Sequence, residues 1–273
     1  MKLKVNFFDT KLRKSYLEKL TILSTLFSFL FLVIEIPNEY KLYAGISLLI
    51  IFIIIYCIMW NYANKQNEAT LNINNSTLIV KIGNIFEEES LKVIAFNEYF
   101  DTQVDNKIIA DNSLNGMYIK SKVTDVSSLD TSIDTDVRFN EKVLSTNDTR
   151  TCGKKKRYRL GSIYQHNDYL LTAFSKFDDD NRAYLNMNDY INFLLNFWNE
   201  IDIIYAGRPV SIPLLGSGIT RFKEYDIPEQ ELLELLIWSF KISRIKFTYP
   251  SNVSIVIHES KKDKINFYNL KEG

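Results

Sequence analysis

Residues that build metal centres and disulfide frameworks are scarce in this chain. Among its 273 residues are two cysteines and two histidines. Cys57 lies in an apolar run and Cys152 in a polar stretch, so we expect no disulfide, and a reducing compartment fits the chain. His166 and His258 are far apart in the sequence, and with the two cysteines they give no spacing typical of zinc ligands. The sequence therefore predicts neither a metal site nor a cofactor.

An excess of charge of either sign is also missing. The chain has 33 basic and 33 acidic residues, so its formal net charge is zero. A dedicated nucleic-acid-binding protein is usually strongly basic, so we expect no nucleic-acid partner. One basic run, 154–157 with Arg159, is interpreted as a solvated loop, with nucleic acid or anionic lipid as the alternatives. No pair of acids and no Ser/His/Asp set stands out, so no catalytic residue is predicted.

Charged residues are nearly absent from two apolar stretches, at about 20–36 and 42–60. As a helix the second stretch spans about 28 Å, close to the hydrocarbon thickness of a bilayer. Only Pro37–Lys41 separates the two, which predicts an antiparallel transmembrane hairpin. A hairpin buried in a soluble protein is disfavoured because Ser47–Trp60 has no polar face. A cleaved signal peptide is disfavoured because a second apolar run follows at once.

Basic residues flank the hairpin unequally. Six precede the first span and Lys65 follows the second, whereas the turn holds only Lys41. Positive residues stay in the cytoplasm, so both termini are predicted to be cytoplasmic. Glu35 is the one acid within a span and is interpreted as lying at headgroup level beside Pro37; a pore or a partner helix is the alternative.

The rest of the chain alternates between strand-like and helix-like patterns, which predicts an α/β layered domain with a mixed sheet. We divide the chain into an N-terminal segment with two transmembrane helices, 1–66, and a ligand-binding domain, 67–273. Asp226 and Glu229 resemble a capping box at the start of a helix, and 124–150 is interpreted as loops with a weak helix. Helices are also expected at 113–123 and 187–204. Strands are expected at 78–83, 92–96, 159–166, 169–177, 210–215, 253–258 and 265–268.

A glycine-rich loop follows one of these strands. The apolar run Val210–Leu215 breaks into Gly216-Ser217-Gly218, and a helix is expected soon afterwards. Two glycines let the backbone turn tightly and approach a ligand, so several N–H groups can converge on one anion. Strand, glycine-rich loop and helix together are typical of phosphate binding in α/β proteins. An ordinary strand-to-helix turn is the alternative, because the loop is neither a Walker A sequence nor GxGxxG.

Three stretches resemble a macro domain, the ADP-ribose-binding α/β/α module. VKIGNI at 80–85 is similar to its first strand and Gly-Asp-Ile turn, AFN at 95–97 to its second strand and asparagine, and 212–221 to its diphosphate loop. A closer resemblance is to the divergent macro domain of Thoeris anti-phage effectors, some of which have two transmembrane helices before this domain. It is carried by 97–102, 107–110, 112–116 and 169–177.

The resemblance implies an effector of bacterial anti-phage immunity in the inner membrane. A TIR-domain enzyme would convert NAD into an ADP-ribose derivative, with a histidine conjugate as the candidate, and the macro domain would bind it. The membrane part would then disrupt the bilayer, leading to cell death or growth arrest. Two helices cannot enclose an aqueous path, so we expect a homo-oligomer.

This sequence departs from the family at two places. Asn84 replaces the usual aspartate, so an amide without charge assistance would meet the adenine amine. Asn97 is followed by Glu98-Tyr99-Phe100 rather than Ala-Ala-Asn, which weakens a role in hydrolysis. A membrane-anchored ADP-ribosyl hydrolase remains the alternative function.

Each candidate ligand-binding residue has a predicted role and an alternative. Arg221 contacts the diphosphate or pairs with Glu224. Asp101 holds ribose hydroxyls or an amine, or caps a loop. Phe100 and Phe177 stack on the ligand or belong to the core. The predicted set is Asn84, Asn97, Phe100, Asp101, Ser113, Leu114, Gly116, Phe177, Leu215, Gly216, Ser217, Gly218, Ile219 and Arg221.

Overall fold

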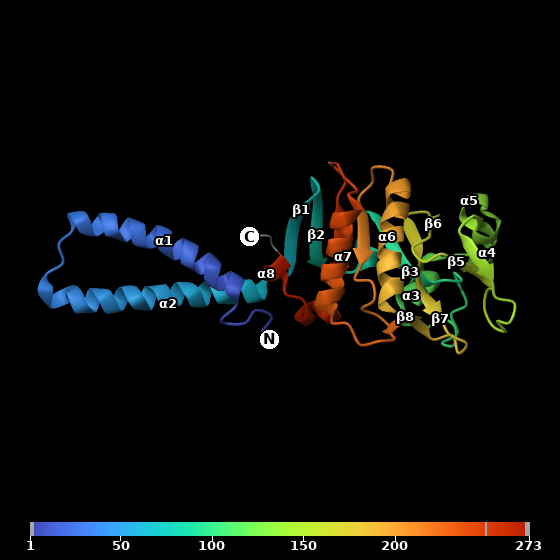
Figure 1. Cartoon of the computed structure of the whole chain (residues 1–273), viewed down its shortest axis with the longest axis horizontal. Coiled ribbons are helices and arrows are strands. Elements are labelled where there is room, and N and C mark those ends of the chain that lie inside the picture. The colour runs from blue at the N-terminus through green and yellow to red at the C-terminus, as the bar shows by residue number, and fades with distance from the viewer. Residues whose placement is uncertain (1–2, 249, 271–273) are drawn as a thin grey trace. The chain divides into compact units, whose positions relative to one another are not determined.

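The computed structural model describes residues 3–248 and 250–270 (Figure 1). Its contacts divide the chain into two compact units. The first comprises Met1–Ala69 and Asp263–Gly273, and the second comprises Thr70–Lys262. Of the residues that the structure describes, 263–270 therefore group with the helical N-terminal part.

Two long helices dominate the first unit. Helix α1 covers Thr10–Val33, the short 3₁₀ helix η1 covers Asn38–Tyr40, and α2 covers Lys41–Lys65. Asp9 begins α1, because its carboxylate accepts hydrogen bonds from Lys11 N and Leu12 N, both 3.0 Å long. Both helices are long and apolar enough to span a membrane, and none of the apolar window of either is buried in the structure.

A small cluster of buried side chains lies at the C-terminal end of α2. Val5, Leu12 and Ala63 pack together there. The Asn64 carboxamide accepts hydrogen bonds from Lys4 N and Val5 N at 2.8 and 3.0 Å, so the N-terminal segment is bonded to α2. The strand predicted at 265–268 is wrong. Helix α8 covers Phe267–Leu270 instead, and the Phe267 side chain is buried.

A mixed nine-stranded sheet forms the second unit, in the order β1-β2-β11-β9-β3-β7-β8-β10, with β6 paired to β7. Strands β2, β11, β9, β3 and β7 run parallel, so their carboxyl ends share one edge. The pairs β6–β7 and β7–β8 are antiparallel, which confirms the predicted mixed sheet. The strands are β1 Glu68–Ile73, β2 Ser76–Ile82, β3 Leu91–Asn97, β6 Ile163–His166, β7 Tyr169–Phe177, β8 Ala183–Leu185, β9 Val210–Pro213, β10 Arg221–Phe222 and β11 Val253–Ile257.

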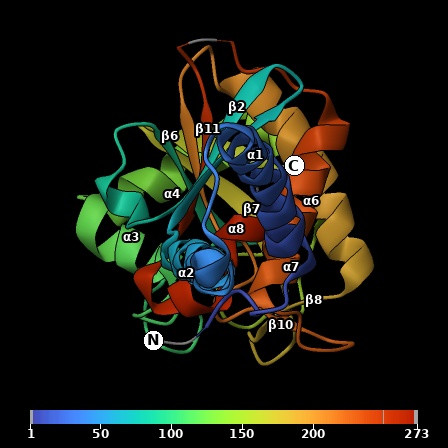
Figure 2. The ribbon, with the colours of Figure 1, turned by 90° about the vertical axis from the view of Figure 1, so that its left-hand side faces the viewer.

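Helices cover both faces of this sheet, which makes three layers (Figure 2). Helices α3 (Leu114–Lys122) and α4 (Val126–Thr135) lie on one face, and α6 (Met187–Ile204) and α7 (Glu229–Ser243) lie on the other. The short elements are α5 Val137–Asn140, the hairpin of β4 Val143–Thr146 and β5 Lys156–Tyr158, η2 Ile85–Glu87 and η3 Glu259–Lys264.

Aromatic side chains fill the core on each face. On the α3 face, the Phe96, Phe100 and Tyr118 rings pack together with Phe139. On the α6 face, fully buried Trp198 contacts Phe240, and its indole N–H donates a 2.8 Å bond to Ser239. Fully burying one large apolar side chain stabilises the fold by about 1.5–3 kcal/mol, so these clusters hold the helices against the sheet.

Three local predictions differ from the structure. The capping box at Asp226 is wrong, because α7 begins at Glu229 after Pro228 and has no side-chain cap. The strand expected at 159–166 is interrupted, since Gly161 turns the chain with a φ of +90° before β6 begins. The stretch 124–150 holds two helices and strand β4, because apolar side chains within it are buried on the sheet.

Candidate functional site

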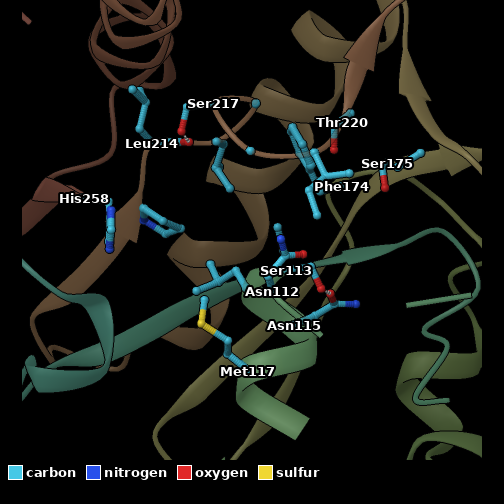
Figure 3. Close-up of a pocket in the computed structure, with 18 of the residues that line it drawn as sticks. Asn112, Ser113, Asn115, Met117, Phe174, Ser175, Leu214, Ser217, Thr220 and His258 are labelled. Carbon is cyan, nitrogen blue, oxygen red and sulfur yellow. Dashed lines mark hydrogen bonds between the residues drawn. The ribbon is translucent and has the colours of Figure 1, made fainter. Parts of the chain in front are cut away.

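A cavity of about 930 Å³ opens at the carboxyl ends of the parallel strands. This volume lies within the range of small-molecule sites in proteins. Figure 3 shows Ser217 and Thr220 of the glycine-rich loop on one side of it, and Asn112, Ser113 and Asn115 at the start of α3 across from them. The cavity lies where ligands bind in open α/β sheets.

Eleven of the fourteen predicted residues line this cavity. They are Asn84, Asn97, Ser113, Leu114, Phe177, Leu215, Gly216, Ser217, Gly218, Ile219 and Arg221. The remaining three, Phe100, Asp101 and Gly116, are not among its lining residues.

The glycine-rich loop begins with a tight turn after β9. The Ser217 hydroxyl donates to the Leu214 carbonyl at 2.7 Å, and Ser217 N donates to the same carbonyl at 3.2 Å. Gly216 has a φ of +91°, a left-handed conformation that favours glycine. The buried Tyr190 hydroxyl donates to the Leu215 carbonyl at 3.2 Å, and burial raises the pKa of Tyr190, so the donor stays protonated. These bonds fix the shape of the loop.

Backbone donors of this loop are left over for a ligand. Within the described part of the chain, no hydrogen bond is made by the N–H groups of Gly216, Gly218, Ile219 or Thr220. A Cβ placed on Gly218 would meet nothing within 4 Å, so open space adjoins this residue. Free N–H groups beside open space at a cavity wall are suited to bind an anion.

Asn84 lies at the end of β2, in the cavity wall. Its side-chain oxygen accepts a bond from Phe86 N at 3.2 Å, and its amide donates to Glu87 at 3.0 Å. Asn84 therefore caps the short helix η2, which holds the carboxamide in one orientation. His258, at the end of β11, lies in the same wall and accepts a bond from Ser260 N at 3.3 Å.

Ser113 is the N-cap of α3. Its hydroxyl accepts a bond from Gly116 N at 3.1 Å and donates to the Ala110 carbonyl at 2.6 Å. A Cβ on Gly116 would lie 2.3 Å from that carbonyl, so only glycine lets α3 pack against the preceding loop. Gly116 therefore supports the cavity wall without lining it. Its neighbours Asn112, Asn115 and Met117 line the cavity.

Asn97 ends β3 and is 2% exposed. Its side-chain oxygen accepts bonds from Tyr99 N at 2.9 Å and Asp101 N at 3.3 Å, and its amide donates to the Asp101 carboxylate at 3.0 Å. Phe100 has a φ of +53°, and this turn directs its ring onto Phe96 in the core. The chain reversal at Phe100 explains why Phe100 and Asp101 face the interior and not the cavity.

Basic side chains outnumber acidic ones around the cavity. Among the described residues Glu259 is the only acid that lines it, against Arg182, Arg221 and Lys261. Lys261 pairs with Glu229 at 2.9 Å and Arg182 with Asp180 at 3.1 Å. Arg221 makes no ion pair in the part of the chain that the structure describes, with Glu224 or with another acid. The excess of positive charge favours an anionic ligand.

Sequence reasoning missed part of the wall. The missed residues include Phe174, Ser175, Asn181, Arg182, Thr220 and His258. Phe174 and Ser175 lie near the carboxyl end of β7, and His258 directly follows β11. Counting outward from each strand end would have found several of them, since this edge is where α/β ligands bind.

The side chains of the basic run 154–157 form ion pairs and hydrogen bonds within the domain. Lys154 pairs with Asp130 at 2.6 Å, Lys156 with Asp134 at 2.5 Å and Arg157 with Glu98 at 3.0 Å. Lys155 donates to the Asp148 carbonyl at 3.4 Å. These contacts join the β4–β5 hairpin to α4 and to the end of β3.

An α/β/α sheet with a glycine-rich loop over a cavity at its carboxyl edge defines a ligand-binding domain of the macro type. The family model described as Thoeris protein ThsA, Macro domain, matches residues 78–258. The Thoeris protein ThsA of Bacillus amyloliquefaciens (strain Y2) is 46% identical over 233 residues, covering 84% of this chain and 76% of that protein. The chain belongs to the ThsA family of Thoeris proteins.

Solved macrodomain structures from Oceanobacillus iheyensis are also similar to this chain. One, with ADP, is 12% identical, covers 75% of this chain and 94% of that one, and has a TM-score of 0.47. Another, a variant with ADPR, is 13% identical, covers 75% of this chain and 96% of that one, and has a TM-score of 0.47.

Proposed function

We propose that this protein is a membrane effector of bacterial anti-phage immunity whose macro domain binds an ADP-ribose derivative. One observation carries the proposal: a fixed loop with unbonded N–H groups forms one wall of a net basic cavity. Such a loop recognises a phosphate group through its backbone, and a diphosphate supplies several acceptor oxygens. The ligand is a signal and not a resident cofactor.

The strand order supports a particular orientation of the ligand. Strand β9, which leads into the glycine-rich loop, lies between β11 on one side and β3 on the other. His258 and Asn84 therefore lie toward one end of the cavity, and Asn97 and Phe177 toward the other. Figure 3 shows His258 and Ser175 at opposite ends. A diphosphate at the loop would direct adenosine toward Asn84 and the second ribose toward Asn97.

The apolar hairpin supports a place in the membrane. Its exposed large side chains include Leu26, Phe29, Leu32 and Ile53, each more than half exposed. Keeping so much apolar surface in water is unfavourable by roughly 25 cal/mol per Å², whereas lipid accepts it. With basic residues on the flanks, we propose a multi-pass protein of the bacterial inner membrane with both termini in the cytoplasm.

The signal itself is proposed to come from a TIR-domain enzyme, as a histidine conjugate or another derivative of ADP-ribose. Binding then favours a self-associated state in which several hairpins disrupt the bilayer, causing cell death or growth arrest. A ligand achieves this only if it binds the associated state more tightly than the resting one.

Binding without turnover is part of the proposal. The acids nearest Asn97 in the chain are already bonded within the protein, Glu98 to Arg157 and Asp101 to Arg150. A carboxylate held in this way is a poor general base, which disfavours a membrane-anchored hydrolase.

Calorimetry on the full chain in detergent tests the proposal. We expect ADP-ribose to bind, and chromatography to recover it unchanged after prolonged incubation. Absence of binding by ADP-ribose and its amino-acid conjugates would refute the ligand class. Release of free products would favour the hydrolase.

A further inference from the structure

We propose that Arg150 is a positioning residue that sets the selectivity of the cavity for the ligand group beyond the diphosphate. The proposal rests on the proposed function. Arg150 is not among the residues that line the cavity, yet it is connected to three that do. Its guanidinium contacts Asn181 and Phe177 directly, and it reaches Asn97 through Asp101.

The Arg150 guanidinium is almost fully buried, with a side chain 7% exposed. It forms a two-pronged ion pair with Asp101, with Nη2–Oδ2 at 2.7 Å and Nη1–Oδ1 at 3.2 Å. Nη1 also donates to the Lys154 carbonyl at 2.6 Å. Paired guanidinium–carboxylate groups of this geometry are rigid and directional. Arg150 therefore serves as a fixed centre to which neighbouring groups are attached.

Three connections lead from this centre to the cavity wall. Nη2 donates to the Asn181 side-chain oxygen at 2.7 Å. The guanidinium carbon lies 5.8 Å from the centre of the Phe177 ring. Asp101, held by Arg150, accepts the Asn97 amide at 3.0 Å. The polar and aromatic groups at this end of the cavity are thus oriented by one side chain.

Further contacts hold Arg150 in place. The Tyr99 ring stacks on the guanidinium at 4.0 Å. Gly153 has a φ of +84°, and a Cβ there would lie 2.6 Å from Asp101 Oδ1. Glycine at this position lets Lys154 N donate to Asp101 at 2.7 Å. The loop thus closes tightly over the ion pair, and water is kept from it.

The position of the network decides which part of a ligand it affects. Asn97 and Phe177 lie at the ends of β3 and β7, on the side of the glycine-rich loop away from Asn84. In the proposed orientation this end receives the second ribose. ADP ends at the diphosphate and lacks the second ribose. The difference in affinity between ADP-ribose and ADP therefore measures what this end of the cavity contributes to binding.

Arg150→Lys in the full chain in detergent tests the inference, with ADP-ribose and ADP as probes in calorimetry. Lysine keeps a positive charge beside Asp101 but loses the planar fork and its bond to Asn181. We expect affinity for ADP-ribose to fall roughly tenfold, the equivalent of one or two lost hydrogen bonds, while affinity for ADP stays within about twofold. Arg208→Lys is the matched control, because Arg208 pairs with Asp168 on the exposed surface and should leave both affinities unchanged.

Tyr99→Leu is a second variant that keeps the ion pair and removes the stacking ring. Like Arg150→Lys, it should lower the ratio of ADP-ribose affinity to ADP affinity. If Arg150→Lys does not fold, Tyr99→Leu provides the test. Equal weakening of both ligands, or an unchanged ratio in a folded variant, overturns the inference. So does a wild-type chain that binds ADP and ADP-ribose equally. Failure of the wild-type chain to bind either ligand or an amino-acid conjugate instead refutes the proposed function itself.

Discussion

The hydroxyl group of Ser217 donates a 2.7 Å hydrogen bond to the backbone carbonyl of Leu214, three residues earlier in the chain. The bond closes the turn that leads from β9 into the glycine-rich loop. Since the hydroxyl is used within the loop, we expect Ser217 to support a ligand through loop shape and not through its side chain. Its neighbour Gly218 adjoins open space instead. Two substitutions separate these roles.

Gly218→Val should abolish binding of ADP-ribose and leave the fold intact. A Cβ at Gly218 meets no protein atom, so the added side chain occupies space that the ligand would need. We expect a loss of affinity of at least about a hundredfold in calorimetry, with a change in unfolding free energy within about 0.5 kcal/mol. Gly218→Ala is the graded control and should weaken binding less. Unchanged affinity in a folded Gly218→Val chain would remove the loop from the site.

Ser217→Ala should have a milder effect. It removes one hydrogen bond and leaves the Leu214 carbonyl bonded to Ser217 N. One such bond contributes about 1 kcal/mol, so we expect ADP-ribose affinity to fall by no more than about tenfold. If Ser217→Ala were as damaging as Gly218→Val, the hydroxyl itself would have to contact the ligand.

Acid should destabilise the ligand-binding domain in part through His166. Burial lowers the pKa of His166 below its usual 6.5, and its Nδ1 lies 2.6 Å from the buried Tyr118 hydroxyl, within hydrogen-bond distance. The unfolded chain therefore binds more protons between the lowered pKa and about 6.5. The contribution of His166 is present above pH 6.5 and is lost as the pH falls toward its folded pKa.

His166→Gln keeps a hydrogen-bonding group near Tyr118 but does not titrate. Urea unfolding of both chains at pH 7.5 and at pH 5.5 measures the effect. We expect a smaller loss of stability on acidification in the variant than in the wild type. An equal loss in both would mean that other groups account for the whole acid sensitivity.

Both ends of the chain should be on the cytoplasmic side of the membrane. External protease added to spheroplasts should leave the ligand-binding domain intact, and permeabilising the membrane should allow its digestion. The basic flanks of the hairpin are the physical reason. Digestion before permeabilisation would reverse the proposed topology.

Membrane damage should require the hairpin and the ligand together. Moving an equilibrium from mostly resting to mostly associated takes roughly 5 kcal/mol of differential ligand affinity, which several bound subunits can share. Liposomes carrying the full chain should release dye only when an activating ADP-ribose derivative is present, and chemical cross-linking should then trap oligomers. Equal leakage with and without ligand, or a saturated protein that stays monomeric, contradicts the mechanism.

The sequence by itself determined the elements whose signal is local. The apolar runs before residue 60 were long enough to predict two spanning helices, and they form α1 and α2. The bounds of β7 and α6 were predicted without error, because β7 is a continuous run of buried residues and α6 has apolar residues at helical spacing. The glycine-rich loop was also predicted, since two glycines around a serine after an apolar run indicate a tight turn from the local sequence alone.

Tertiary structure alone decided which residues share the cavity. Asn97 and Asp101 are four residues apart, yet the left-handed turn at Phe100 leaves one in the cavity wall and buries the other against Arg150. Arg150 itself comes from a polar stretch with no periodicity, and its partners Asp101 and Asn181 are 49 and 31 residues away. Such pairings depend on strand order and loop closure, which bring distant residues together. No local sequence pattern predicts them.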